Sequence, residues 1–378
     1  MWIEGTYNRA EVFTDSLEAH AEKQLRQICS LPCAAGWNIR VMPDVHFCSI
    51  LRVNGLTASF GGELPPALLG FDIGCGLLVA RLRQREVDLQ KLHEAVLRSI
   101  PCWPSERERP HPLALDFPWE KLRCQTAIIR DEALPKVGVL VTGGNHFIEL
   151  CRGEDGALYL TFHAGCVGVA KYIAQYYQEL ACEAAGLSPI FARDIGPDSF
   201  RNVGAACTLS GKALEDYLTD VETVSKLARL SRQIMLEELC KEMGFEIEDS
   251  FDTMHNTLSS DERILRKGAV SAYEGERLYI PINMRDGGYI CRGKGNGEWN
   301  CSAPHGAGRV LTRRQAARQI GVEEYRKASP NVYIPKGTEA VADAPQAYKP
   351  AEEILRRIGP TVEVLEHLTP LYNFKNNG

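Results

Sequence analysis

The longest helical pattern in this 378-residue chain runs from Lys212 to Met243. Apolar side chains recur along it at intervals of three and four residues and form a broad stripe. The stripe consists of Leu214, Tyr217, Leu218, Val221, Val224, Leu227, Leu230, Ile234 and Leu239. A stripe this broad is typical of a helix covered by a second layer, so the pattern predicts a scaffold helix that packs against the rest of the fold.

Shorter patterns on both sides of this segment mix helix and strand. Helices are predicted over 16–30, 88–99, 313–326 and 350–367, and from about Lys171 onward. Strands are predicted over 39–42, 77–82 and 158–164, as a strand, glycine turn and strand over 137–151, and as short segments within 252–309. Because no repeat, low-complexity tract or linker interrupts them, we expect one α+β domain over residues 1–378, with a β-rich core surrounded by helices.

The composition restricts the class of protein. The formal net charge of −6 argues against a surface that is basic throughout, although a local basic cleft is compatible with it. The N-terminus lacks a signal-peptide pattern and no apolar run is long enough to span a bilayer, so we expect a cytoplasmic protein without a membrane segment. The 13 cysteines contain no CxxC pair, which predicts mostly reduced, buried thiols.

Five of the nine histidines lie in turns rich in glycine or asparagine: His46, His146, His163, His255 and His305. A single histidine in such a turn usually makes an ordinary hydrogen bond. Several together, joined by a carboxylate and a thiol, favour a metal site. Asp72 and Cys75 supply these groups in the tight turn GFDIGCG. A mixed set of nitrogen, oxygen and sulfur ligands is compatible with Zn²⁺, Mn²⁺ or Fe²⁺ and does not choose among them.

Seven motifs occur in the order MPDVH, GFDIGCG, TGGNHFIE, FHAG, HN, RKGA and HGAGR, between residues 41 and 309. In this order they resemble the RtcB family of RNA ligases, with GGNHFIE and HGAGR the strongest matches. The resemblance implies a single RtcB-like domain. It also implies a site with two Mn²⁺ ions held by Asp72, Cys75, His146, His163 and His255, in which both ions share Cys75.

The resemblance implies a GTP site as well. Its residues would be Asn145 and Asn256 at the phosphates, Phe147 and Glu149 beside the nucleotide, Asn283, Met284, Gly306, Ala307 and Gly308, and Lys375 at the guanine. In PHGAGR, His305 would attack GTP and become a histidine-GMP intermediate. Contacts with RNA or phosphate would come from Asp44, His46, Lys267, Arg285, Arg309 and Tyr348.

The activity implied by this resemblance joins RNA ends that carry a 3'-phosphate or 2',3'-cyclic phosphate to 5'-hydroxyl ends. Such a ligase acts in RNA repair or in the splicing of transfer RNA or ribosomal RNA, and an archease-like activator or another repair factor is an expected partner. The sequence leaves two alternatives open. One is a metal-dependent phosphoesterase of the same fold that opens cyclic phosphates, and the other is a non-catalytic RNA-binding relative.

Some segments depart from the family pattern. After His163 the chain reads AGCVG, so that a family arginine is missing near Val167, and Asn283 and Gly288 fall where the family contacts the nucleotide differently. Lys267 is expected to be an exposed lysine and CRGKGNG, residues 291–297, a surface hairpin turn. The chain therefore resembles a short, divergent branch that keeps the metal ligands and His305.

Overall fold

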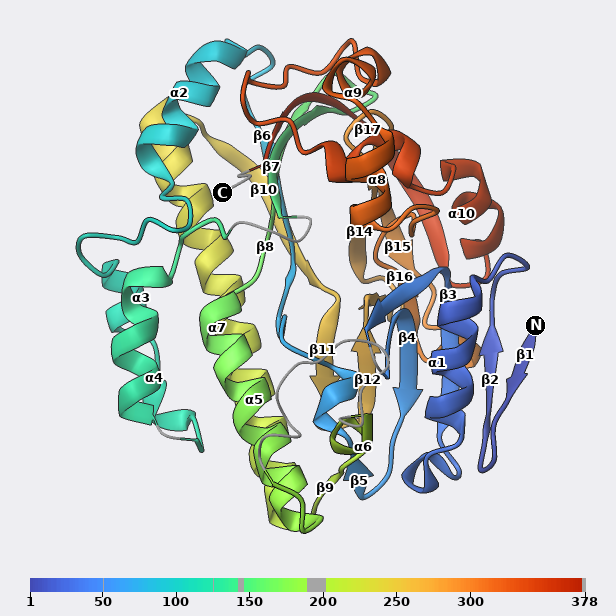
Figure 1. Ribbon diagram of the computed structural model, residues 1–378. Coiled ribbons are helices and arrows are strands. Elements are labelled where there is room, and N and C mark those ends of the chain that lie inside the picture. The colour runs from blue at the N-terminus through green and yellow to red at the C-terminus, as the bar shows by residue number, and fades with distance from the viewer. Residues whose placement is uncertain (50, 125, 142–145, 189–201, 376–378) are drawn as a thin grey trace.

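A computed structural model describes residues 1–49, 51–124, 126–141, 146–188 and 202–375, and two large sheets lie at its centre (Figure 1). The first sheet has the order β1 (Trp2–Glu4), β2 (Arg9–Val12), β3 (Asn38–Ser49), β4 (Arg52–Ser59), β12 (Ile264–Lys267) and β11 (Asn256–Ser259). The second has the order β10 (Ile247–Met254), β6 (Gly76–Leu82), β8 (Leu158–Ala164), β7 (Phe147–Arg152), β17 (Val362–Phe374), β15 (Gly287–Gly293) and β14 (Arg277–Asn283). Neighbouring strands are antiparallel except β2 and β3.

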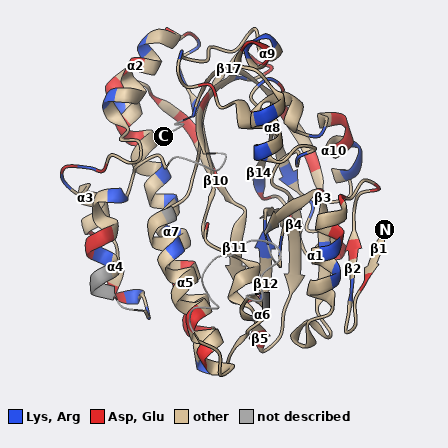
Figure 2. Cartoon of the chain, viewed as in Figure 1, with Lys and Arg blue, Asp and Glu red and all other residues tan. Residues whose placement is uncertain are grey.

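Two short strand pairs and a set of outer helices complete the described part of the chain. The pairs are β13 (Ala269–Ser271) with β16 (Ser302–Pro304) and β5 (Glu63–Leu64) with β9 (Leu209–Ser210). The helices are α1 (Ala19–Cys29), α2 (Leu89–Ser99), α3 (Pro112–Leu115), α4 (Thr126–Ala133), α5 (Val167–Ala184), α6 (Asn202–Ala205), α7 (Gly211–Met243), α8 (Arg313–Gln319), α9 (Val322–Ala328) and α10 (Ala351–Ile358). Lys, Arg, Asp and Glu residues occur on the outer helices, whereas strand β11 contains none (Figure 2). This arrangement confirms the α+β class, and the single domain over 1–378 stays a prediction.

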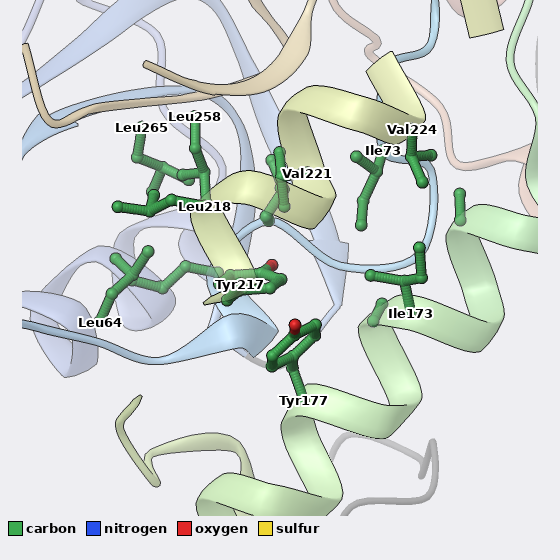
Figure 3. Packing of buried hydrophobic residues seen from close by; sticks show 14 of the residues in the cluster. Leu64, Ile73, Ile173, Tyr177, Tyr217, Leu218, Val221, Val224, Leu258 and Leu265 are labelled. Atoms are coloured by element: carbon green, nitrogen blue, oxygen red, sulfur yellow. The ribbon is translucent and has the colours of Figure 1, made fainter. Parts of the chain in front are cut away.

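Helix α7 lies where the sequence predicts a scaffold helix and ends at Gly244, which adopts the left-handed conformation common at helix ends. Its buried face packs against α5 and against the turn that contains Ile73 (Figure 3). Gly74, in the same turn, has a φ of +75°, and a Cβ there would lie 2.7 Å from Ser225 Cα of α7. The close approach requires glycine and places the next residue, Cys75, at the edge of the second sheet.

The predicted helices agree with the structure except in two segments near the C-terminus. The segment 313–326 forms two helices, α8 and α9, because the chain leaves the helical conformation at Ile320 and Gly321. Of the segment 350–367, only Ala351–Ile358 is helical, and β17 begins at Val362. Gly359 and Pro360 follow the helix, and the rest of the segment pairs with β15 and β7, so tertiary pairing overrides the helical pattern. Helix α5 begins at Val167, four residues before the expected start near Lys171.

Two strand predictions also need correction. The second arm of the expected unit over 137–151 is β7, but the described part of its first arm contains only a bridge between Leu140 and Cys102. The expected hairpin turn at 291–297 is wrong, because residues 291–293 form the end of β15 and the chain then enters a 3-10 turn at Gly297–Trp299.

The described cysteines are free and most are buried, as predicted. Among the described residues, none of the helices is long and apolar enough to span a membrane.

A buried carboxylate ties α7 to its neighbours and gives a test of this packing. Asp220 is fully buried and accepts hydrogen bonds from the backbone N–H groups of Arg123 and Cys124 and from Tyr177 Oη of α5. Asp220→Ala leaves these buried donors unpaired, so we expect the free energy of unfolding to fall by roughly 2–5 kcal/mol. Chemical denaturation measures it. Glu222→Ala, at an exposed position of α7, serves as the control and should change it by less than about 0.5 kcal/mol.

Candidate active site

Four strands of the second sheet bring the predicted metal ligands to one edge. Cys75 directly precedes β6, and His146 directly precedes β7. His163 lies in β8, where it is paired with Leu77 of β6 on one side and Phe147 of β7 on the other. His255 follows β10, and its backbone N–H donates to Cys75 O at 2.9 Å. Antiparallel pairing therefore places these side chains together although they are far apart in the sequence.

The side chains form two overlapping groups. Cys75, His163 and His255 make one, and Asp72, Cys75 and His146 make the other, with the ligand atoms of each group within 4.8 Å of one another. Cys75 Sγ lies 3.3 Å from His146 Nε2 and 3.4 Å from His163 Nε2, and His163 Nε2 lies 3.0 Å from His255 Nε2. Cys75 thus belongs to both groups.

The chemistry of this cluster fits a metal centre. Cys75 and the three histidines are buried, and Asp72 Oδ1 has no hydrogen-bond partner among the described residues. Burial raises the pKa of the Cys75 thiol and lowers the pKa of His255, so an ion that binds here meets a neutral imidazole and must displace the thiol proton. A nitrogen, sulfur and oxygen set of this kind suits a transition-metal ion, and it does not select one.

Arg232 of α7 stabilises the segments that carry the ligands. It was not singled out in the sequence, because it sits within the apolar stripe. Its side chain is fully buried and forms an ion pair with Asp252 at 2.7 Å. Its Nη1 donates to Gly74 O at 3.0 Å and to Ala164 O at 2.6 Å. These carbonyls belong to the neighbours of Cys75 and His163, so one guanidinium fixes both ligand-bearing segments.

His305 lies beside the metal-ligand cluster, with its ring centroid 4.8 Å from that of His255. His305 Nδ1 is 2.7 Å from Asp44 Oδ2, and the His305 backbone N–H donates to the same oxygen at 3.2 Å. Because a carboxylate only accepts hydrogen bonds, Nδ1 carries the proton and Nε2 keeps its lone pair. Gly308 has a φ of +73°, and a Cβ there would lie 2.3 Å from Asp44 O. The turn after His305 therefore fits tightly against Asp44.

A cavity that is open to solvent extends from His305. Predicted residues that line it are His46, Phe147, Glu149, His163, Asn283, Met284, His305, Gly306, Ala307, Gly308, Arg309, Tyr348 and Lys375. Residues that the sequence analysis missed are Asn54, Pro281, Ile282, Gly287, Arg313, Asp343 and Asn373. Five of the missed residues belong to segments with no feature beyond ordinary periodicity. Pro281 and Ile282 lie in β14, Gly287 begins β15, Arg313 begins α8 and Asn373 lies near the end of β17.

One end of the cavity contains a buried acid and a buried cation. Glu149 accepts a hydrogen bond from Asn373 Nδ2 at 2.7 Å, and burial raises its pKa to about 7. Lys375 Nζ lies 5.8 Å from the centre of the Phe147 ring and donates to Asp343. An acceptor and a donor therefore lie beside an aromatic ring, a combination that suits a heteroaromatic base.

Three of the predicted phosphate contacts have hydrogen-bond partners within the protein. Asn256 Nδ2 donates to Asp72 O at 3.0 Å, and its Oδ1 accepts from the Gly268 backbone N–H at 3.1 Å. Arg309 donates to Leu311 O, to Ala342 O and to Asp343. His46 is bonded to Asp44 O and Asn54, and burial lowers its pKa to about 4. His46 and Arg309 line the cavity, whereas Asn256 lies outside its lining.

The remaining predictions differ in outcome. Lys267 is buried rather than exposed, because it lies in β12 between β4 and β11, and burial lowers its pKa. Arg285 is exposed and pairs with Asp286 at the turn between β14 and β15, outside the cavity lining. Asn145 lies outside the described residues. Gly288 packs so closely that a Cβ would lie 2.5 Å from Tyr279, which accounts for glycine at this position.

The sequence profile described as tRNA-splicing ligase RtcB matches residues 119–376. The chain belongs to the RtcB family. It is 27% identical to the RNA-splicing ligase RtcB of Escherichia coli K12, an alignment that covers 97% of this chain and 94% of the relative. It is 24% identical to the tRNA-splicing ligase RtcB of Pyrobaculum aerophilum, over 91% of this chain and 89% of the relative. A third relative, RNA-splicing ligase RtcB2 of Escherichia coli strain ATCC 25922, is 26% identical over 96% and 93%.

The shared position of Cys75 predicts that one substitution disables both ligand groups of this RtcB protein. We expect Cys75→Ala to weaken metal binding by at least about 100-fold, because each group loses its sulfur. Calorimetric titration with Co²⁺ measures the loss. Cys240→Ala removes another buried thiol, in α7, and should bind Co²⁺ like the unmodified protein. Unchanged binding by Cys75→Ala would contradict the shared ligand.

Proposed function

We propose that this protein is a GTP- and Mn²⁺-dependent RNA ligase that joins 3'-phosphate or 2',3'-cyclic phosphate ends to 5'-hydroxyl ends through a histidine-GMP intermediate on His305. The observation that carries the proposal is the arrangement of His305, whose Nδ1 is tied to Asp44 beside the metal-ligand cluster. The names of the relatives, RNA-splicing and tRNA-splicing ligases, support RNA as the substrate.

In the first step His305 Nε2 attacks the α-phosphorus of GTP. A phosphorus–nitrogen bond forms, the bond to the β-phosphate oxygen breaks, and pyrophosphate leaves. The imidazole becomes positively charged as it attacks, and the Asp44 carboxylate 2.7 Å from Nδ1 stabilises this charge. A neutral imidazole needs no separate base for this attack, because Nε2 already carries a lone pair.

We propose that two Mn²⁺ ions bind at this cluster. Their ligands would be Asp72, Cys75, His146, His163 and His255. When bound, the ions would neutralise charge on the phosphates. The backbone N–H groups of Gly306, Ala307 and Gly308 offer further anion contacts along the turn. Asn145 and Asn256 remain proposed neighbours of the phosphates.

Guanine matches the buried end of the cavity. Its Watson–Crick edge carries a carbonyl acceptor and two N–H donors. Lys375 can donate to the carbonyl and the Glu149 carboxylate can accept from the N–H groups, with Phe147 against the ring. Asn283 and Met284 line the same cavity and complete the proposed nucleotide site.

In the second stage the 3'-phosphate of RNA takes GMP from His305, which breaks the phosphorus–nitrogen bond. The 5'-hydroxyl then attacks the activated 3'-phosphate, and GMP leaves. We propose that the residues near the RNA or its phosphate are Asp44, His46, Lys267, Arg285, Arg309 and Tyr348. Asp44 would act indirectly, through its hydrogen bond to His305. An archease-like activator and a cytoplasmic location belong to the same proposal.

An assay of RNA joining separates the ligase from a phosphoesterase of the same fold. We expect RNA fragments with 2',3'-cyclic phosphate and 5'-hydroxyl ends to be joined when both GTP and Mn²⁺ are present, and denaturing gels measure the longer product. Omission of GTP should prevent joining. If the cyclic phosphate is opened in the presence of both GTP and Mn²⁺ but no joined product forms, the result would support the phosphoesterase instead. A non-catalytic relative would bind the RNA and change neither end.

Glu149 predicts a pH dependence of guanine binding. Because burial raises its pKa to about 7, the carboxyl group is mostly protonated at pH 6 and mostly ionised at pH 8. Only the ionised form accepts both N–H groups of guanine, so affinity should rise about tenfold between these pH values. Calorimetric titration with guanosine, which has no titrating phosphate, measures the rise. Glu149→Gln should bind more weakly at pH 8 and lose this dependence; an equally steep rise in that variant would contradict the assignment.

A further inference from the structure

Asp343 is a buried carboxylate on which three cations of the cavity wall converge. It ends the 3-10 turn Val341–Asp343 and is 4% exposed. Its Oδ1 accepts from Arg309 Nη1 at 2.7 Å, from Tyr348 Oη at 3.2 Å and lies 3.3 Å from Arg313 Nε. Its Oδ2 accepts from Lys375 Nζ at 3.1 Å. The partners come from the His305 turn, from α8, from the 345–350 segment and from the residue directly after β17.

The charges around this carboxylate do not cancel. Three cations, Arg309, Arg313 and Lys375, face the single carboxylate of Asp343 at this part of the cavity wall. Although burial alone would raise the pKa of Asp343, the cations Lys375, Arg313 and Arg309 hold it below its ordinary value. Burial lowers the pKa of Lys375, and Asp343 opposes that effect. Asp343 therefore keeps a buried ammonium charged while the wall stays attractive to an anion.

The three cations differ in what they can still bind. Arg309 is held by Leu311 O and Ala342 O in addition to Asp343, so it forms a fixed part of the wall. Lys375 uses one of its N–H groups to donate to Asp343. Among the described residues, no second hydrogen-bond acceptor for Lys375 is identified. Its other two donors are available inside the cavity, beside Phe147. The direction of those donors is set by the bond to Asp343.

We propose that Asp343 is a positioning residue that aims Lys375 Nζ at the nucleobase and so determines the preference for guanine over adenine. The inference rests on the proposed function for the place of the base in the cavity. Guanine presents a carbonyl oxygen where adenine presents an amino group, and an ammonium can donate to the first but not to the second. A buried ammonium facing the adenine amino group leaves donors unpaired, which is the kind of mismatch that gives strong discrimination.

The test compares guanosine and adenosine binding by calorimetry, which requires no metal and no transfer of GMP. We expect the unmodified protein to prefer guanosine. Asp343→Asn keeps the size of the side chain but turns N–H donors toward the cations, so the ratio of guanosine to adenosine affinity should fall at least about tenfold. Asp249→Asn, which breaks an exposed pair with Arg277 away from the cavity, should keep the original ratio.

A second variant separates positioning from stability. Lys375→Met should lower the same ratio to a similar extent, and the double variant Asp343→Asn with Lys375→Met should be no less selective than Lys375→Met alone. A merely structural role would lower the melting temperature without changing the ratio. The proposal is overturned if Lys375→Met or a folded Asp343→Asn keeps the original ratio, or if the unmodified protein shows no preference. A protein that prefers guanosine but never forms a GMP adduct would instead overturn the proposed ligase step.

Discussion

The hydrogen bond between Asp44 and His305 is the constraint on which the arrangement of the site depends. It joins β3 of the first sheet to the turn that follows β16, and it leaves Nε2 of His305 as the atom with a lone pair. Lys349 reinforces the same junction, because its Nζ donates to Pro43 O at 3.0 Å and its backbone N–H donates to Gly308 O at 3.1 Å. A displacement of the turn by one residue would move His305 away from the metal-ligand cluster.

The metal-ligand cluster depends on a second constraint, the packing of α7 against the edge of the second sheet. Gly74 allows the ligand turn to approach Ser225, and Arg232 then holds the carbonyls next to Cys75 and His163. A buried arginine without a carboxylate partner would be costly, and Asp252 supplies that partner. Helix α7 thus contributes directly to the geometry of the cluster, since it fixes the positions of Cys75 and His163 before any ion binds.

The sequence predicted those features that have a local cause. Helix α7 was predicted within one residue of its observed ends, because its apolar period is a local feature of the sequence. The recurrence of histidines in glycine turns indicated a metal site, and the resemblance to the RtcB family named its ligands. Only strand pairing brings His163 beside Cys75. Strand β17 was mistaken for helix, since its pairing partners are distant in the chain. Asp343 and Arg232 were missed for the same reason: an ordinary Asp or Arg gains its role only from tertiary neighbours.

The most direct test of the account is transfer of label from GTP to a single histidine. The protein is incubated with GTP labelled at the α-phosphate and Mn²⁺, and the labelled peptide is identified by mass spectrometry under alkaline conditions, because a phosphorus–nitrogen bond is labile to acid. The account predicts one GMP on the peptide that contains His305 and none in His305→Ala, while His111→Ala, altered at a histidine away from the cavity, is labelled fully. Label on another residue, or the same label in His305→Ala, would contradict it.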